Sequence, residues 1–185
     1  LTSGNEICVQ VRLTDPSNSF TRLVPYEYAF PWFQNPRKSE TGKSFARRAA
    51  TAGWIELSGS FGDAGIRIQI GSAYRSAATQ DSLYNGYVAS SGQAFADLTS
   101  ARPSFSEHQT GLSIDFSSED GQCFLEKCFT DTTEGKWLAA NAPSYGFVLR
   151  YPLNKTAITG YDFEPWHFRY LGKQVAMQIT DSGVT

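Results

Sequence analysis

The chain has only two histidines, and each lies beside carboxylates in a short, largely polar segment. His108 shares residues 106–115 with Asp115, and His167 follows Glu164 by three positions. Two imidazoles and one carboxylate are a common ligand set for a catalytic metal that keeps one position open for water. A further carboxylate near that water can act as the general base. A shared site would require a fold that brings the middle of the chain to its C-terminal part, and this is the strongest constraint on the fold.

Each segment alone also has a purely structural explanation. A single histidine in a half-apolar segment is more often a core or surface residue than a ligand, and Asp115 can simply follow a strand. The two segments together favour the metal, because the whole histidine supply of the chain stands beside carboxylates and small polar residues. The residues alone therefore indicate a metal-dependent hydrolase.

At 185 residues the chain is long enough for one domain with a sizeable core. We expect residues 1–185 to form a single domain that acts as a monomer. The net charge of -2 and the lack of Lys or Arg runs argue against nucleic-acid binding. No apolar stretch reaches the roughly 18 residues that span a bilayer. A targeting or anchoring segment can nevertheless precede Leu1.

The three cysteines bear on the redox compartment. Cys123 and Cys128 are five positions apart and can close a small disulfide loop, which implies an oxidising compartment. Buried free thiols are the alternative, and the odd number allows no full pairing. Zinc binding by cysteine is disfavoured, since no Cys-x-x-Cys pair exists. We expect a bridge between Cys123 and Cys128.

The N-terminal part differs in pattern from the rest of the chain. Prolines repeatedly interrupt residues 1–41, so we expect this stretch to be irregular. The dense aromatic residues at 26–33 favour an arm packed on the body of the protein, because a linker would be polar. A short Ala-rich helix is predicted over residues 43–53, ending at Gly53.

The remaining chain mixes strands and helices without a regular βαβ rhythm. Residues 66–70 and 111–116 alternate in polarity, which predicts half-buried strands. Two aromatic strands are predicted at 147–151 and 166–170, bridged by a turn containing Gly160. Helices are predicted over residues 77–89, with Ser76 as cap, and over residues 92–99 and 173–180. A further helix is predicted to begin at the capping pair Asp131 and Glu134 and to stop before Pro143. This pattern favours an α+β fold with a mainly antiparallel sheet flanked by helices.

A shared metal site sets two local requirements. We do not expect His108 and Asp115 to be neighbours on one helix face. A loop that doubles back at Gly111 can bring them together, because glycine supplies the backbone freedom. In a regular strand, the odd spacing of Glu164 and His167 would send their side chains to opposite faces. Pro165 drives Glu164 towards an extended conformation and excludes a normal ladder hydrogen bond. We therefore expect Glu164 in a kinked lead-in and His167 on the strand.

The two segments also carry a family resemblance. The pattern S-x-H-x-x-G-x-S-x-D at residues 106–115, followed by E-x-W-H at 164–167, resembles the zinc D-alanyl-D-alanine carboxypeptidases of the VanY type, together with related L,D-carboxypeptidases. Further similar stretches, in the order of the family, lie at residues 72–76 with Gln80, 102–112, 146–152 and 159–172. The similarity covers about residues 66–182, taken as the catalytic core, with residues 1–65 as the N-terminal arm and helix. Ser113 departs from the family's usual alanine, although a small residue is retained.

The resemblance implies a zinc site at the centre of the sheet. Zn2+ would be held by His108, Asp115 and His167, with water in the fourth position. Zinc can lower the pKa of bound water to about 7. Glu164 would take the proton from that water and later pass it to the leaving amine. The implied reaction is attack on the carbonyl of the last peptide bond, with zinc sharing the charge of the tetrahedral intermediate.

Arg75, Ser106 and Gln80 are candidates for contact with the substrate. Arg75 would polarise the carbonyl or grip the substrate, and its alternative is a solvated arginine just before a helix. Ser106 and Gln80 are candidate hydrogen-bond partners of the substrate's terminal carboxylate, and either can instead be a helix or loop cap.

Trp166 and Tyr151 are further substrate-binding candidates, with Trp166 expected mainly to pack beneath the site. Arg169 lies two positions from His167 on the predicted strand and so shares its face. It can pair with a carboxylate rather than act on substrate.

The function expected from this resemblance is a bacterial cell-wall carboxypeptidase, extracytoplasmic in the envelope or secreted. It would trim the terminal D-alanine from peptidoglycan stem peptides or precursors. An L,D-carboxypeptidase or a peptidoglycan endopeptidase would share the metal motifs. A non-catalytic zinc-containing module that binds cell-wall peptide is a different class of protein. Glu164 argues against it, because such a module would not need this residue. A structural zinc domain is disfavoured because the cysteines lie outside both motifs.

Overall fold

The computed structural model describes residues 2–3, 6–12, 21–25 and 39–183. Backbone contacts divide the chain into two units, Leu1–Ala46 and Arg47–Thr185. The second unit contains every candidate site residue. The expectation of a single domain over residues 1–185, with a catalytic core starting at residue 66, stays a prediction.

The first unit contains a small antiparallel sheet, so the expectation of irregular structure over residues 1–41 is wrong for its strands. They are β1 (Thr2–Ser3), β2 (Glu6–Arg12) and β3 (Thr21–Pro25), in the order β1-β2-β3. The apolar residues of β2 alternate with other residues, which is the strand pattern that the frequent prolines concealed. The aromatic segment 26–33 lies outside the described residues.

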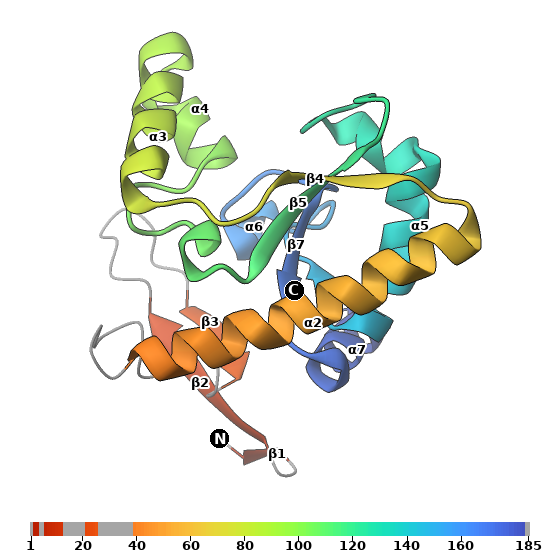
Figure 1. Cartoon of the computed structure of the whole chain (residues 1–185). Helices are drawn as coiled ribbons and strands as arrows, with labels where there is room; N and C mark the ends of the chain where they lie inside the picture. Colours follow the sequence, from red (N-terminus) through yellow and green to blue (C-terminus); the bar gives the residue numbers. More distant parts are fainter. Residues whose placement is uncertain (1, 4–5, 13–20, 26–38, 184–185) are drawn as a thin grey trace. The chain divides into compact units, whose positions relative to one another are not determined.

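The second unit is built on a four-stranded antiparallel sheet (Figure 1). Its strands are β4 (Ile68–Ser72), β5 (Ser113–Ser118), β6 (Phe147–Leu149) and β7 (His167–Tyr170), in the order β4-β5-β7-β6. The predicted α+β fold with a mainly antiparallel sheet is therefore confirmed. Strand β5 carries Asp115 and strand β7 carries His167, and these two strands are the central pair of the sheet.

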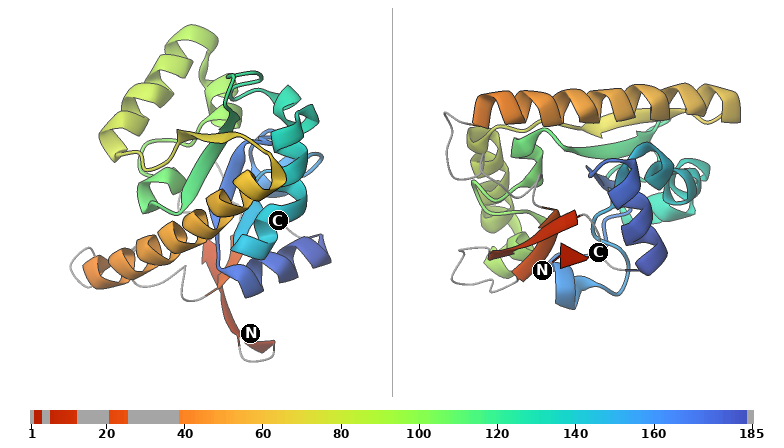
Figure 2. Two further views of the ribbon diagram at one scale, coloured as in Figure 1. Left: turned by 45° about the vertical axis from the view of Figure 1, so that its right-hand side comes forward. Right: turned by 90° about the horizontal axis from the view of Figure 1, so that it is seen from below.

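Helices surround this sheet. In Figures 1 and 2, α3 and α4 lie side by side at one end of it, while α5 and α7 lie towards the other. The α-helices are α2 (Ser39–Ala64), α3 (Ala77–Ser91), α4 (Gln93–Thr99), α5 (Thr133–Asn141), α6 (Thr156–Thr159) and α7 (Lys173–Ser182). Three 3-10 turns, η1 (Glu107–Thr110), η2 (Lys127–Asp131) and η3 (Ala142–Tyr145), complete the described elements. The predicted helices at 77–89, 92–99 and 173–180 are confirmed, and Ser76 caps α3 by accepting from the Thr79 backbone N–H.

Helix α2 runs well past Gly53, where the sequence predicted its end. Gly53 is not a cap but a point of close packing. A Cβ at this position would lie 2.5 Å from Tyr170 Cε2 and 2.9 Å from the Tyr145 carbonyl oxygen. The helix instead ends at Ala64, followed by Gly65 with a left-handed φ of 68°.

The start of α5 also differs from the prediction. The cap is Thr132, whose hydroxyl accepts from the Gly135 backbone N–H at 3.0 Å, and not Asp131. The helix stops at Asn141, before Pro143 as expected, and continues into η3. The shift is one residue, because a threonine and an aspartate are both good caps.

One face of the sheet forms the aromatic core. Trp54 of α2 stacks on Phe116 of β5 with ring centroids 5.7 Å apart, and Phe116 meets Phe168 of β7 edge to face at 5.3 Å. Phe61 of α2 joins this cluster. Aromatic pairs of this kind contribute roughly 0.5–1.5 kcal/mol each beyond the burial of their area. The core therefore fixes β5 and β7 against α2 and leaves their other face for polar side chains.

The structure tests the disulfide expectation. Cys123 and Cys128 form a disulfide, as predicted. Among the described residues, no helix combines the length and the apolar character needed to cross a bilayer.

Candidate metal centre and active site

Asp115 and His167 meet because β5 and β7 pair in antiparallel register. The two residues are direct partners across the strands, so their side chains leave the sheet on the same face. Asp115 Oδ1 lies 3.0 Å from His167 Nδ1. Their neighbours in sequence, Phe116 and Phe168, belong to the core on the opposite face. The alternation of the strands thus separates the polar site from the apolar core.

His108 reaches the same point from η1. Ser106 caps this turn by accepting from the His108 backbone N–H, and Gly111 ends it with a left-handed φ of 73°. This glycine makes the reversal that the sequence required between His108 and the strand. His108 Nε2 comes to 3.2 Å from Asp115 Oδ2. Its other ring nitrogen, Nδ1, contacts the Ala73 carbonyl oxygen.

These three side chains are suited to holding a metal ion. Ligand atoms of His108, Asp115 and His167 all lie within 4.8 Å of one another, and the residues are only 3%, 3% and 5% exposed. Because a carbonyl oxygen can only accept, His108 Nδ1 carries the proton and Nε2 points a lone pair at the Asp115 carboxylate. Asp115 Oδ1 is buried and makes no hydrogen bond within the described part of the chain. The nitrogen lone pair of His108 and the carboxylate oxygen that it faces are suited to binding a cation in this buried site, and nitrogen with carboxylate oxygen is a donor set that zinc accepts.

Glu164 lies beside this group in the lead-in to β7. A turn closed by the His167 backbone N–H and the Glu164 carbonyl oxygen, 3.1 Å apart, replaces regular strand structure around Pro165. Glu164 Oε2 is 3.8 Å from His167 Nδ1. Burial is the main cause that raises the pKa of Glu164 to about 7, and the nearby Asp115 carboxylate adds to it. A carboxyl with such a pKa can exchange protons near neutral pH.

At Asp115 and His167, the effect of neighbouring charges on the pKa is opposite to the effect of burial. Burial by itself would raise the pKa of Asp115, but the adjacent His108 and His167 imidazoles hold it well below its usual range. Burial would likewise lower the pKa of His167, but Asp115 and Glu107 raise it to about 9. In the absence of metal, positive charge is therefore favoured at His167 and negative charge at Asp115.

Arg75 also points at the site. Its Nη2 is 3.7 Å from Asp115 Oδ2 and donates to Ser72 Oγ at 3.0 Å. Its Nη1 donates to Gln80 Oε1 at 2.8 Å. Gln80 is fully buried, and its amide nitrogen donates to Ser100 Oγ and to the Ala101 carbonyl oxygen. Gln80 is thus held inside the protein, where it orients Arg75.

The structure places the other candidates around the site in different ways. Ser106 is buried and serves as the cap of η1. The Tyr151 ring lies 4.9 Å from the His167 ring. Trp166 is partly buried against the aromatic core, and its carbonyl oxygen accepts from the Phe116 backbone N–H. Arg169 Nη1 is 3.8 Å from a carboxylate oxygen of Glu107, which is the type of pairing expected for it.

Glu107 also lies beside the site, although the sequence did not indicate it as a candidate residue. Its Oε2 lies 3.6 Å from His167 Nε2, and its Oε1 accepts from Arg150 Nε at 2.9 Å. The signal was its position directly before His108, inside the same motif. Arg150 gave no signal, because only the fold brings the end of β6 beside η1.

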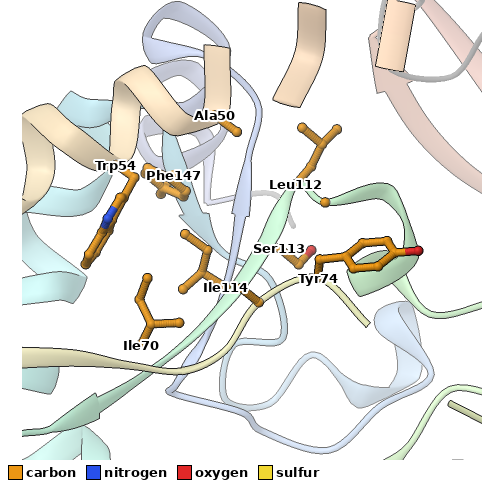
Figure 3. A pocket seen from close by; sticks show the side chains of 10 residues that line it. Ala50, Trp54, Ile70, Tyr74, Leu112, Ser113, Ile114 and Phe147 are labelled. Atoms are coloured by element: carbon orange, nitrogen blue, oxygen red, sulfur yellow. The ribbon is translucent and has the colours of Figure 1, made fainter. Parts of the chain in front are cut away.

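A pocket of about 380 Å³ lies in the second unit (Figure 3). Its lining includes Trp54 of α2, Ile70 of β4 and Ile114 of β5. None of the three metal-ligand candidates lines it. Its lining nevertheless includes Ala73 and Ser113, which contact His108 and Glu107.

Comparison with known proteins gives a consistent result for the sequence. Residues 43–173 match the model of a family described as VanY, D-alanyl-D-alanine carboxypeptidase. The chain is 34% identical over 184 residues to YodJ of Bacillus subtilis strain 168, in an alignment covering 94% of this chain and 67% of YodJ.

Solved structures of similar fold include the LdcB LD-carboxypeptidase. It superposes with a TM-score of 0.69 at 39% identity, covering 74% of this chain and 64% of LdcB. A variant of the vancomycin resistance D,D-pentapeptidase VanY from a VanB-type cassette, solved in complex with Zn(II), gives a TM-score of 0.64 at 29% identity and covers 73% of this chain and 78% of that one. The chain thus spans about two thirds of the length of YodJ and of LdcB.

Proposed function

Because the chain belongs to the VanY family of D-alanyl-D-alanine carboxypeptidases, we propose that it is a zinc-dependent carboxypeptidase. Its substrate is a peptidoglycan stem peptide or precursor, from which it removes the C-terminal D-alanine by cleaving a D,D-peptide bond. The observation that carries this proposal is the convergence of His108, Asp115, His167 and Glu164 at one buried point.

The ligand set is His108, Asp115 and His167, through Nε2, a carboxylate oxygen and Nδ1. When bound, Zn2+ supplies a Lewis acid and lowers the pKa of a coordinated water to about 7. The Ala73 carbonyl oxygen keeps His108 in the tautomer that leaves Nε2 free to bind a cation.

Glu164 is the general base. It lies on the same side as the ligand atoms, 3.8 Å from His167 Nδ1, and its raised pKa of about 7 suits proton uptake near neutral pH. The same carboxyl then returns the proton to the leaving amine of D-alanine. Arg75 supplies a fixed positive charge 3.7 Å from Asp115, which offsets the negative charge that develops on the substrate carbonyl oxygen. Ser106, Tyr151 and Trp166 remain proposed substrate contacts, and Gln80 acts through Arg75.

An L,D-carboxypeptidase is the second candidate function. The likeness to LdcB, at 39% identity, exceeds the likeness to the D,D-enzyme VanY, at 29%. Both activities release a terminal D-alanine and use the same metal ligands, and they differ in the residue that precedes the scissile bond.

The proposed location is outside the cytoplasm, in the cell envelope or beyond it. Peptidoglycan lies there, and the Cys123–Cys128 disulfide is typical of an oxidising compartment.

The test uses defined stem pentapeptide and tetrapeptide, each incubated with the zinc-loaded protein and with protein stripped by a chelator. Mass spectrometry of the products identifies the bond that is cut. Loss of one D-alanine from the pentapeptide, abolished by chelation and restored by zinc, is expected. Trimming of the tetrapeptide alone would assign the L,D-activity instead. Tight binding of both peptides without any product would refute the enzyme and support a binding module.

A further inference from the structure

We propose that Glu107 is a positioning residue for the metal centre, which accepts the Nε2–H of His167 and thereby presents Nδ1 of that ring to the metal. This inference rests on the proposed zinc site and adds a residue outside the ligand set. It concerns how the ring of one ligand is held, and it does not require Glu107 to touch either substrate or metal.

The first argument is the orientation of the His167 ring. Its Nδ1 faces Asp115 Oδ1 at 3.0 Å and Glu164 Oε2 at 3.8 Å. Its Nε2 therefore points away from the ligand group. This nitrogen is buried and makes no hydrogen bond within the described residues. The Glu107 carboxylate lies 3.6 Å from it, so that a small side-chain rotation completes a hydrogen bond.

The second argument is that Glu107 is itself held in place. Arg150 Nε donates to its Oε1 at 2.9 Å, while Arg169 Nη1 lies 3.8 Å and Ser113 Oγ 3.4 Å from its Oε2. The side chains of Arg150 and Arg169 are both 10% exposed. Positive charge on two sides compensates the partly buried carboxylate, which is thereby tied to Arg150, directly after β6, and to Arg169 of β7.

The third argument is the contrast between the two histidines. His108 faces the ligand group with Nε2 and contacts a backbone carbonyl oxygen with Nδ1. His167 uses the opposite nitrogen for each purpose, and its partner is a carboxylate. Outer partners of this kind fix the tautomer and raise the basicity of a metal-bound imidazole, and their loss typically weakens metal binding about 10–100-fold.

The test measures zinc affinity by competition with a chromophoric chelator, using the folded chain and its E107A and E107Q variants. E107A is expected to bind zinc about 10–100-fold more weakly. E107Q keeps a neutral acceptor and should fall between E107A and the wild type. D97A is the matched control, because Asp97 also pairs with an arginine, Arg102, but contacts no metal ligand that the structure describes. Its zinc affinity should equal that of the wild type.

A second readout is the 15N–1H NMR spectrum of the histidine side chains, which contains only two rings. In the zinc-loaded wild type, His108 should carry its proton on Nδ1 and His167 on Nε2. Loss of Glu107 should accelerate solvent exchange of the His167 Nε2–H and leave the His108 signal unchanged. A general loss of structure would disturb both rings.

The outcomes separate this inference from the proposed function. A wild type that binds no zinc would overturn both. Zinc binding by the wild type with equal affinity and an unchanged His167 signal in E107Q and E107A would overturn only the role of Glu107. Should E107A fail to fold, because it leaves Arg150 buried without its partner, E107Q decides alone. Wild-type affinity and exchange in that variant would count against the proposal.

Discussion

Glu164 combines burial with a position beside the ligand group, and these two properties define its proposed role. It is 9% exposed, and its pKa is raised to about 7 mainly by burial. Ionisation of a buried carboxyl lowers the free energy of unfolding. A residue with a purely structural role would not need an ionisable group at this position. Its neighbours at the site are either ligand candidates or groups that orient them.

The first prediction concerns Glu164→Gln. The variant should lose about 10²–10⁴-fold in turnover of stem peptide, because the amide cannot accept the proton. It should keep stoichiometric zinc, since Glu164 lies outside the ligand set. Mass spectrometry of products and elemental analysis of the protein check the two halves. Undiminished turnover by zinc-loaded E164Q would remove Glu164 from the mechanism.

The second prediction concerns the stability of the metal-free protein against pH. The folded-state pKa of Glu164, about 7, lies above its ordinary value of 4.5. Between these values the folded state binds more protons than the unfolded state, so the free energy of unfolding falls as pH rises. Above pH 7 this loss of unfolding free energy is complete, on the order of 3 kcal/mol for a shift of this size.

E164Q lacks this cost and should therefore be more stable than the wild type at pH 7.5, but nearly equal to it at pH 4.5. Urea unfolding in the presence of a chelator at both pH values checks this difference. The same gap at both pH values would mean that burial does not hold the carboxyl neutral.

At the scale of elements, close packing decides where α2 lies against the sheet. Gly53 sits where a side chain would collide with Tyr170 and with the Tyr145 backbone. Gly59, further along the same helix, has nothing within 4 Å of the position of a Cβ. One glycine is thus required by packing, while the other only weakens the helix.

The third prediction follows from this contrast. Gly53→Ala should destabilise the protein by about 1–3 kcal/mol, because the added methyl group forces Tyr170 and the backbone apart. Gly59→Ala, its matched control, should stabilise by roughly 0.5–1 kcal/mol through helix propensity. Chemical denaturation of both variants gives the comparison. A neutral or stabilising Gly53→Ala would show that α2 can shift without cost.

At the scale of the whole molecule, the proposed metal site joins parts of the chain that are distant in sequence. Its proposed ligands come from η1, β5 and β7. An ion bound only by the folded arrangement stabilises that arrangement by mass action, by about 2.7 kcal/mol when its free concentration is 100 times Kd.

The fourth prediction is that zinc raises the midpoint of thermal unfolding of the wild type and of E164Q, and that a chelator reverses the rise. Asp115→Ala and His167→Ala should lose this response, because each removes a ligand. Differential scanning calorimetry with and without zinc measures it. A full zinc response in both ligand variants would contradict the assignment.

The sequence by itself determined most of the local structure of residues 66–183. Apolar alternation marked β4, β5 and the two aromatic strands, and capping residues marked the starts of helices, because these signals depend on neighbours within a few positions. It also supplied the histidines and carboxylates of the candidate site and the cysteine pair. The same local signals failed at Gly53, where a contact with a distant tyrosine, and not a cap, explains the glycine.

Only the tertiary structure decided how those residues meet. The register of β5 on β7 makes Asp115 and His167 direct partners, and a slip of one residue would send one of them into the aromatic core. The contacts of Gln80 with Arg75 and of Glu107 with His167, on which their proposed roles rest, come from the same source. Such contacts join elements far apart in the chain, and their partners are chosen by packing and strand pairing, which no short stretch of sequence encodes.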